Sequence, residues 1–391
     1  MSYSNQFGLT DEQQSLLDHA DKFSREQLYP LAPKMDNEEW WPEDAFPKLG
    51  ELGLLGVTIS PEYGGAGMDL LSAGLIGQAI SRWNHALALS WVAHDNLCAN
   101  NLFCNGSEFI RQKYLPKLCT GKHIGALGLT EPGAGSDALG SMRTTAKRQG
   151  DYYLLNGTKL YITNGPVADI VLVYAKTDPL KGSKGISAFV IEKGFPGFKV
   201  AQKLIKMGFR GSQTGELIFE DCKVPVENLV GKENEGHKVV MSGLDIERAM
   251  ISPILVGICE RALELSVEYA KTREQFGEPI ANFQMIQSKL AEMYVAVETM
   301  KTFTYQILAE ADAIAGGESG RGRIHMQTAA SIMFAADSAN KVLDEMVQIH
   351  GGSGYIWESE ANRLFRATKL LEIGAGTTEV RKLIISQGML K

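Results

Sequence analysis

The sequence LTEPGAGSD at residues 129–137 is the stretch around which the rest of the chain is organised. It follows an apolar segment and precedes residues typical of β-strands. Gly133 and Gly135 are expected to permit backbone conformations closed to other residues and a close approach to a ligand. Thr130, Ser136 and the free amides offer hydrogen bonds to an anion. The stretch therefore indicates a loop that holds a cofactor, with a plain structural turn as the alternative.

Residues 133–138 also match the dinucleotide-binding pattern G-x-G-x-x-A. That pattern indicates a dinucleotide site only when a strand precedes it and a helix begins at the glycines. Here Pro132 interrupts the start, and strand-like residues follow at 143–147 and 152–155. The sequence therefore argues against a Rossmann-type site at this position.

The hydrophobic period on either side of this loop changes from helical to alternating and back. Thr10 and Gln13 form a capping-box pattern, and Ser107 is a candidate N-cap. Helices are predicted from residue 10 to Pro30, and over 46–55, 70–104 with at least one break, and 109–118. Strands are predicted over 152–156, 160–163, 170–176, 186–192 and 215–220. Helices return after Pro225, over 237–273, 282–315, 322–350 and 378–389, enough for a helical bundle.

These changes predict an α+β multidomain protein with an N-terminal all-α domain (1–122), a middle β domain (123–230) and a C-terminal helical bundle (231–391). With 44% hydrophobic and 22% charged residues, the composition is that of an ordinary globular protein. A net charge of −7 offers no basic surface to nucleic acid. Five cysteines without a C-x-x-C pair argue against a disulfide framework and a metal site.

No apolar run reaches the length of a membrane span, and the first eight residues are polar. We therefore expect no membrane partner and a cytoplasmic protein of a bacterium. A mature form in the mitochondrial matrix is the alternative.

Glu247 interrupts an apolar stripe in the third domain. Positions 240, 244, 247, 251, 254 and 258 share one helical face and hold Val, Leu, Glu, Ile, Ile and Ile. A carboxylate there is expected to be partly desolvated, which raises its pKa and suits it to take a proton from carbon. The alternative is a salt bridge to a nearby cation, or an edge position on a less regular helix.

The sequence EIGAGTTE at residues 372–379 is the second notable feature of this domain. Its glycines end one helix, and Thr377 or Thr378 can cap the next. The capped helix start is suited to a phosphate or a flavin edge, although a simple linker needs no ligand.

Five stretches in order resemble the acyl-CoA dehydrogenase family over nearly the whole chain. They are LTEPGAGSD (129–137), NGTKLYITNG (156–165), TREQFG (272–277), QIHGGSGY (348–355) and GTTE (376–379). The resemblance implies a helical domain, a β-barrel-like domain and a four-helix bundle. It also implies a homotetramer in which FAD lies between the β domain and the bundle and extends across a subunit interface.

The resemblance assigns roles where residues match. Six residues of the β domain would contact the flavin ring, its N5 edge or the pyrophosphate: Leu127, Leu129, Thr130, Ser136, Tyr161 and Thr163. A neighbouring subunit's FAD would be reached by Arg273, Gln275, Phe276, Gln284, Gln348 and Gly352, and adenosine-side groups by Thr377 and Glu379. Substrate contacts are implied for Ser136, Asp245, Arg248, Gly374, Ala375 and Gly376.

The family's catalytic base is usually a glutamate where this chain has Ala375. A minority, including the isovaleryl-CoA dehydrogenases and the long-chain enzymes, carries the base at the position of Glu247. Gly374 resembles the isovaleryl-CoA dehydrogenases and would leave room for a branch beside the β-carbon of the substrate. Pro253 and Gly133 depart from that subgroup, so the acyl pocket is expected to differ in shape.

The resemblance thus implies FAD-dependent α,β-dehydrogenation of a short branched-chain acyl-CoA to the 2-enoyl-CoA, with electrons passed to electron-transferring flavoprotein. Glu247 would remove the α-proton, and the Glu247 backbone amide would help to hold the thioester carbonyl. The alternatives are an acyl-CoA dehydrogenase of other chain specificity, an oxidase, and a non-redox acyl-CoA-binding or lyase-type relative with flavin as a scaffold.

Overall fold

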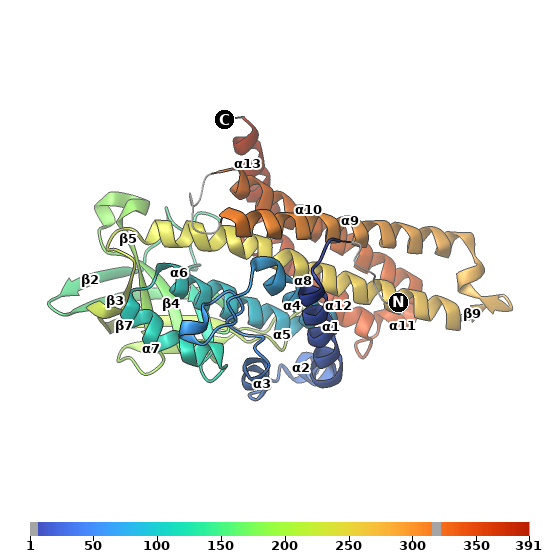
Figure 1. Ribbon diagram of the computed structural model, residues 1–391, viewed down its shortest axis with the longest axis horizontal. Coiled ribbons are helices and arrows are strands. Elements are labelled where there is room, and N and C mark those ends of the chain that lie inside the picture. Colours follow the sequence, from blue (N-terminus) through green and yellow to red (C-terminus); the bar gives the residue numbers. More distant parts are fainter. Residues whose placement is uncertain (1–6, 315–321, 391) are drawn as a thin grey trace.

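The computed structural model describes residues 7–314 and 322–390 (Figure 1). The expected helix end at residue 315 and the outer ends of the first and last domains lie outside these ranges. Helices dominate both ends of the chain and a mixed β-sheet occupies its middle, which confirms the predicted fold class. Among the described residues, no helix is both long and apolar enough to cross a bilayer.

The N-terminal helices begin where the capping residues predict. Thr10 and Gln13 form a reciprocal capping box at the start of α1 (Asp11–Phe23), and the Ser107 side chain accepts a bond from the Ile110 amide at the start of α7 (Glu108–Cys119). The predicted helix over 46–55 is shorter, because α3 (Ala45–Glu51) ends before Gly53, whose φ is +68°. The structure adds α2 (Ala32–Glu38), which the sequence reading missed.

The break expected within residues 70–104 lies at Asn84, between α4 (Leu70–Trp83) and α5 (His85–Val92). The buried Asn84 amide donates to the carbonyl of Leu28 at 2.9 Å, and its oxygen accepts from the Leu87 amide at 3.1 Å. These bonds satisfy backbone groups at the break. The chain continues through a π-helical segment, η4 (Ala93–Asn100), into α6 (Asn101–Asn105).

The middle domain is an eight-stranded mixed sheet in the order β6-β7-β3-β2-β4-β5-β8, with β1 paired to β4. Its strands are β1 (Gly125–Gly128), β2 (Thr145–Gln149), β3 (Tyr152–Thr163), β4 (Ile170–Lys176), β5 (Ile186–Glu192), β6 (Phe198–Lys203), β7 (Thr214–Pro225) and β8 (Leu229–Val230). The parallel β1–β4 pairing sets Leu127 opposite Leu172. Because the 129–137 loop follows β1 directly, it is fixed to the centre of the sheet.

The C-terminal domain is built on α8 (Gly236–Thr272), α9 (Gln284–Ile314), α10 (Arg323–His350) and α13 (Thr378–Met389), with the short α11 (Gly352–Tyr355) and α12 (Glu360–Thr368) between the last two. Helix α8 has 37 residues and is therefore about 55 Å long. Figure 1 shows the sheet at one end of α8 and the hairpin of β9 (Glu274–Gln275) and β10 (Glu278–Pro279) at the other.

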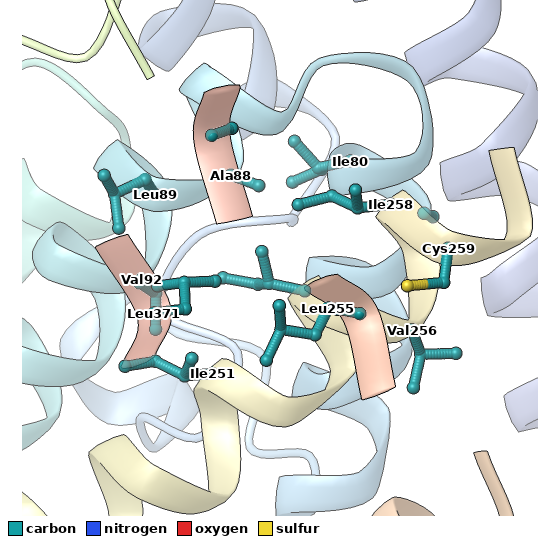
Figure 2. Packing of buried hydrophobic residues seen from close by; sticks show 14 of the residues in the cluster. Ile80, Ala88, Leu89, Val92, Ile251, Leu255, Val256, Ile258, Cys259 and Leu371 are labelled. Carbon is teal, nitrogen blue, oxygen red and sulfur yellow. The ribbon is translucent and has the colours of Figure 1, made fainter. Parts of the chain in front are cut away.

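The largest apolar core joins the first and last domains. Figure 2 shows Leu89 and Val92 from α5 packed near Ile251 and Leu255 of α8, with Leu371 beside them. Leu371 belongs to η8 (Lys369–Glu372), which leads directly into the glycine-containing 372–379 stretch. The core therefore holds that stretch against α8, close to the apolar stripe that contains Glu247.

Candidate functional site

The 129–137 loop is braced by a buried ion pair that the sequence reading did not single out. The ammonium of Lys159 on β3 lies 2.8 Å from Glu131 Oε1 and donates to the carbonyl of Leu129 at 3.1 Å. Glu131 also accepts bonds from the amides of Arg143 and Thr144, at 2.6 and 3.0 Å. The two ends of the loop are thereby tied to one carboxylate, and Glu131 and Ala134 close the tight turn between them.

Burial and pairing act in opposite directions on this pair. Burial lowers the pKa of Lys159 to about 8, while Glu131 opposes the shift. For Glu131, burial alone would raise the pKa, but Lys159 and the hydrogen bonds from residues 143 and 144 hold it below its ordinary value. The pair is therefore ionised at neutral pH, and loss of either partner would leave an uncompensated buried charge.

Gly133 and Gly135 do not adopt the backbone conformations, closed to other residues, that the sequence predicts for them. Neither Gly133 nor Gly135 has a positive φ, so neither conformation is reserved for glycine. A Cβ atom added at either residue would meet nothing within 4 Å. What the glycines provide is open space beside exposed main chain, next to Ser136, which is also exposed. A bulky anionic ligand can approach the backbone there.

Strand β3 carries Tyr161 and Thr163, two of the residues that the family resemblance assigns to the flavin. Tyr161 lies in an irregular part of the β3–β7 pairing between Lys159 and Ile162 and has φ +62°. A non-glycine residue in this conformation is strained, and such strain is frequent at ligand sites. The Tyr161 side chain is 66% exposed, while Thr163 is half-buried and paired with Thr214. Leu127, Leu129 and Thr130 are half-buried or buried at the end of β1, and Thr130 O accepts from the Leu160 amide.

Glu247 lies in the interior of α8 on the stripe that the sequence predicts. Val240, Ile251, Ile254 and Ile258 on that stripe are buried, and Glu247 is half-buried. Among the described residues, its carboxylate forms no hydrogen bond and no ion pair, so the alternative of a salt bridge is not realised here. Burial raises the pKa of Glu247 to about 7, and the cations Arg248 and Arg381 limit that rise.

The Gly374–Gly376 turn is held by two arginines from different helices, one of which, Arg248, directly follows Glu247. Arg248 on α8 donates through Nε to the carbonyl of Ala375 at 3.2 Å. Arg381 on α13 donates through Nη2 to the carbonyls of Leu371, at 2.9 Å, and Gly374. Ala375 and Gly376 both have positive φ, +55° and +91°, which turns their amides away from the helical direction. Among the described residues, those two amides donate no hydrogen bond.

Asp245 and Arg248 form one buried network with a residue that the sequence reading missed. Arg248 Nη1 donates to Asp245 Oδ1 at 3.1 Å, and His325 Nδ1 lies 2.5 Å from the same oxygen. His325 comes from the first turn of α10. Nothing local in the sequence around residue 325 points to this contact, because it depends on how α10 packs on α8.

The residues expected to reach a neighbouring subunit's cofactor lie far from this site. Arg273 directly follows the last residue of α8 and lies 26 residues beyond Glu247, which corresponds to about 39 Å along the helix. Gln275, Gln284, Gln348 and Gly352 are exposed, and Phe276 is 96% exposed. Thr377 instead lies by the turn, where its hydroxyl caps α13 by accepting from the Val380 amide, and Glu379 is exposed in the first turn. One copy of the chain thus presents two separate groups of the expected cofactor-binding residues.

Three sequence-family models match the chain. They describe the N-terminal domain (residues 10–122), the middle domain (126–222) and the C-terminal domain (234–390) of acyl-CoA dehydrogenases. The mitochondrial isovaleryl-CoA dehydrogenase of Solanum tuberosum is 42% identical over 393 residues, covering 100% of this chain and 93% of that protein.

Relatives named for other acyl groups are similarly close. The short-chain specific acyl-CoA dehydrogenase of Clostridium acetobutylicum is 40% identical, covering 97% of this chain and 98% of that protein. The structure of butyryl-CoA dehydrogenase from Megasphaera elsdenii matches with a TM-score of 0.94 and 38% identity, covering 99% of this chain and 100% of that one. These similarities define the fold and the class of chemistry but do not distinguish one acyl chain from another.

Proposed function

This chain belongs to the acyl-CoA dehydrogenase family, and we propose that it catalyses the FAD-dependent α,β-dehydrogenation of a short branched-chain acyl-CoA such as isovaleryl-CoA. It is an oxidoreductase that acts on a CH–CH bond. The observation that carries the proposed mechanism is Glu247, a carboxylate without a hydrogen-bond partner among the described residues, beside the Gly374–Gly376 turn.

Glu247 has the properties of a general base for an α-proton. A pKa near 7 leaves a substantial ionised fraction at neutral pH and gives the carboxylate more basicity than an exposed glutamate has. Ala375 cannot accept a proton, so the position that carries the base in most of the family cannot provide one here. The rigid helix α8 fixes the base, and the network of Asp245, Arg248 and His325 fixes that turn of the helix.

The thioester carbonyl requires donors other than the Glu247 backbone amide. Glu247 lies inside α8, where its amide belongs to the helical hydrogen-bond ladder and is not free for a ligand. The amides of Ala375 and Gly376 have no acceptor among the described residues and lie on the turn that Arg248 and Arg381 hold. We therefore assign the role of stabilising the developing enolate oxygen to this turn.

The residues around the 129–137 loop fit a flavin cofactor. The open space at Gly133 and Gly135, the exposed ring of Tyr161 and the braced main chain at Leu129 and Thr130 form a surface that a planar ring system can cover. FAD supplies the hydride acceptor for the substrate's β-carbon when it is bound. Arg273 suits the pyrophosphate of FAD bound to another copy, because a guanidinium pairs well with phosphate.

The branch in the proposed substrate is motivated by Gly374. A Cβ atom at this residue would meet only the Leu370 carbonyl, at 3.5 Å, so the space next to the turn is not filled by protein. We propose that the branch at the substrate's β-carbon occupies that space. The electrons then pass to an electron-transferring flavoprotein, and the active form is a homotetramer in which Arg273 and Gln348 serve a neighbour's FAD.

A panel of acyl-CoA thioesters mixed anaerobically with the FAD-loaded protein tests the proposal. We expect isovaleryl-CoA to bleach the flavin absorbance faster than butyryl-CoA or octanoyl-CoA. Preference for a straight chain would overturn the substrate assignment and leave the reaction class intact. Thioester binding without any bleaching would favour the non-redox alternative instead.

A further inference from the structure

Arg381 on α13 is one of the largest fully buried side chains of the molecule. Its Nη2 donates to the carbonyls of Leu371 and Gly374, while Nε and Nη1 have no hydrogen-bond partner among the described residues. No carboxylate in the described part of the chain lies within ion-pair distance of it. Burial of a guanidinium with unsatisfied donors is costly, so its presence here calls for a compensating role.

The electrostatic neighbours of Arg381 connect it with Glu247. Burial and the nearby Arg248 lower the pKa of Arg381 to about 10, so it remains a cation at neutral pH, and Glu247 is the carboxylate that most opposes this shift. Glu247 is itself without a hydrogen-bond partner among the described residues. A buried cation without an ion pair, which binds the carbonyl of Gly374, therefore interacts electrostatically with a carboxylate that also lacks an ion pair.

We propose that Arg381 is a positioning residue for the base Glu247: it clamps the Gly374–Gly376 turn through two carbonyls and supplies the positive charge that keeps the neighbouring carboxylate ionised. This inference rests on the proposed function, because it assigns Arg381 to the same base. Arg381 acts through Glu247 and the turn and has no assigned contact with the reacting atoms.

Two cations lower the pKa of Glu247, Arg248 more than Arg381, and they differ in whether they already have a carboxylate partner. Arg248 on α8 is neutralised by Asp245 at 3.1 Å, and His325 from α10 shares the same carboxylate oxygen. Tyr174 on β4 is a buried phenol whose pKa is raised by burial, so it carries no charge at neutral pH. Glu372 and Glu379 raise the pKa of Arg381 less than Glu247 does and form no ion pair with it. Arg381 thus remains the cation near Glu247 that has no carboxylate of its own.

The test measures anaerobic flavin reduction by stopped flow between pH 6 and 9, in Arg381→Gln and in the charge-retaining control Arg381→Lys. The rate of the unchanged protein should rise with pH through a midpoint near 7, as Glu247 ionises. Loss of a nearby positive charge should raise the midpoint in Arg381→Gln by about one pH unit. The ionised fraction at pH 7 then falls from about one half to about one tenth, so the rate at pH 7 falls about fivefold and recovers at pH 9.

Arg381→Lys should keep the midpoint of the unchanged protein, even if its maximal rate is lower. A purely structural role would reduce FAD content or the rate equally at every pH in Arg381→Gln and leave the midpoint in place, and that result would overturn the inference. If Arg381→Gln does not take up FAD, the measurement is repeated with Arg381→Met, which also removes the charge: a raised midpoint supports the role of the charge, and a midpoint equal to that of Arg381→Lys contradicts it.

Glu247→Gln separates this inference from the proposed function. Near-normal flavin reduction by Glu247→Gln would show that Glu247 is not the base and would remove both conclusions. A slow Glu247→Gln variant together with an unshifted midpoint in Arg381→Gln would remove only the role of Arg381. In the double variant, the pH dependence caused by Arg381→Gln should vanish.

Discussion

Replacement of Glu247 with Gln should increase the stability of the protein at alkaline pH. The carboxylate has a pKa of about 7 in the folded chain and an ordinary value of 4.5. Below pH 4.5 both states are protonated and the pKa difference has no effect. Between pH 4.5 and 7 the unfolded chain releases the proton first, so stability falls as pH rises through this window and then stays level.

The pKa difference sets the size of the effect. A shift of this order corresponds to about 3 kcal/mol, and solvent screening of the half-buried side chain reduces the expected value to about 2 kcal/mol. Glu247→Gln cannot ionise and avoids the whole loss. Thermal unfolding of the two proteins should therefore give similar midpoints at pH 5 and a clearly higher midpoint for Glu247→Gln at pH 8.5. Equal midpoints at both pH values would show that Glu247 is not a desolvated carboxylate.

The same variant should lose the chemistry while it keeps binding. Removal of a general base typically slows a reaction by about 10² to 10⁴, so flavin reduction by isovaleryl-CoA should be at least about a hundredfold slower. FAD content and acyl-CoA binding should be retained, because Gln preserves the size of the side chain. The added substitution Ala375→Glu should restore part of the rate. Ala375 already has φ +55°, so glutamate adds little backbone strain there.

Three further variants test other parts of the site. Lys159→Met should destabilise the protein by about 3–5 kcal/mol and lower FAD retention, because Glu131 keeps a buried charge, and the double variant with Glu131→Gln should recover stability in denaturant unfolding. Gly374→Leu should slow isovaleryl-CoA at least about tenfold relative to butyryl-CoA in the acyl-CoA panel, with unchanged FAD content. Arg273→Ala should weaken FAD binding in equilibrium dialysis without changing secondary structure by circular dichroism, since Arg273 is exposed within one copy; unaltered FAD affinity would contradict its assignment.

Local sequence patterns predicted those strands whose apolar residues are buried in the folded protein. Strands β4 and β5 were predicted with the bounds they have, because continuous apolar runs there are buried on both faces. Strand β1 was not predicted, since a four-residue Gly-Ala-Leu-Gly segment has no alternation and depends on its partner β4. Strand β6 was missed because it is mostly exposed and stabilised only by its pairing with β7. Its side chains therefore carry no burial signal.

The same limit applies to the candidate site. Glu247 could be predicted as a site residue because it is the one charged residue on an apolar stripe, and that pattern can be recognised within a single predicted helix. Arg381 and His325 could not, since their significance comes from α13 and α10 packing against α8. Lys159 lay within a recognised motif, but only the β1–β4–β2–β3 arrangement reveals that it braces the preceding loop. The site residues that could not be predicted from the sequence are therefore mostly those whose roles depend on contacts between distant segments.

Helix α8 constrains how these residues can act together. Glu247 lies within α8 and Arg273 directly follows its last residue, so the regular rise of the helix holds the two residues about 39 Å apart. FAD is long, but a flavin ring next to Glu247 and a pyrophosphate next to Arg273 of the same copy would require a much longer cofactor. No rearrangement of loops can shorten this distance, because a continuous helix joins the two residues. If both residues serve FAD, each copy must contribute Glu247 to one site and Arg273 to another, so the complete site requires at least two copies of the chain.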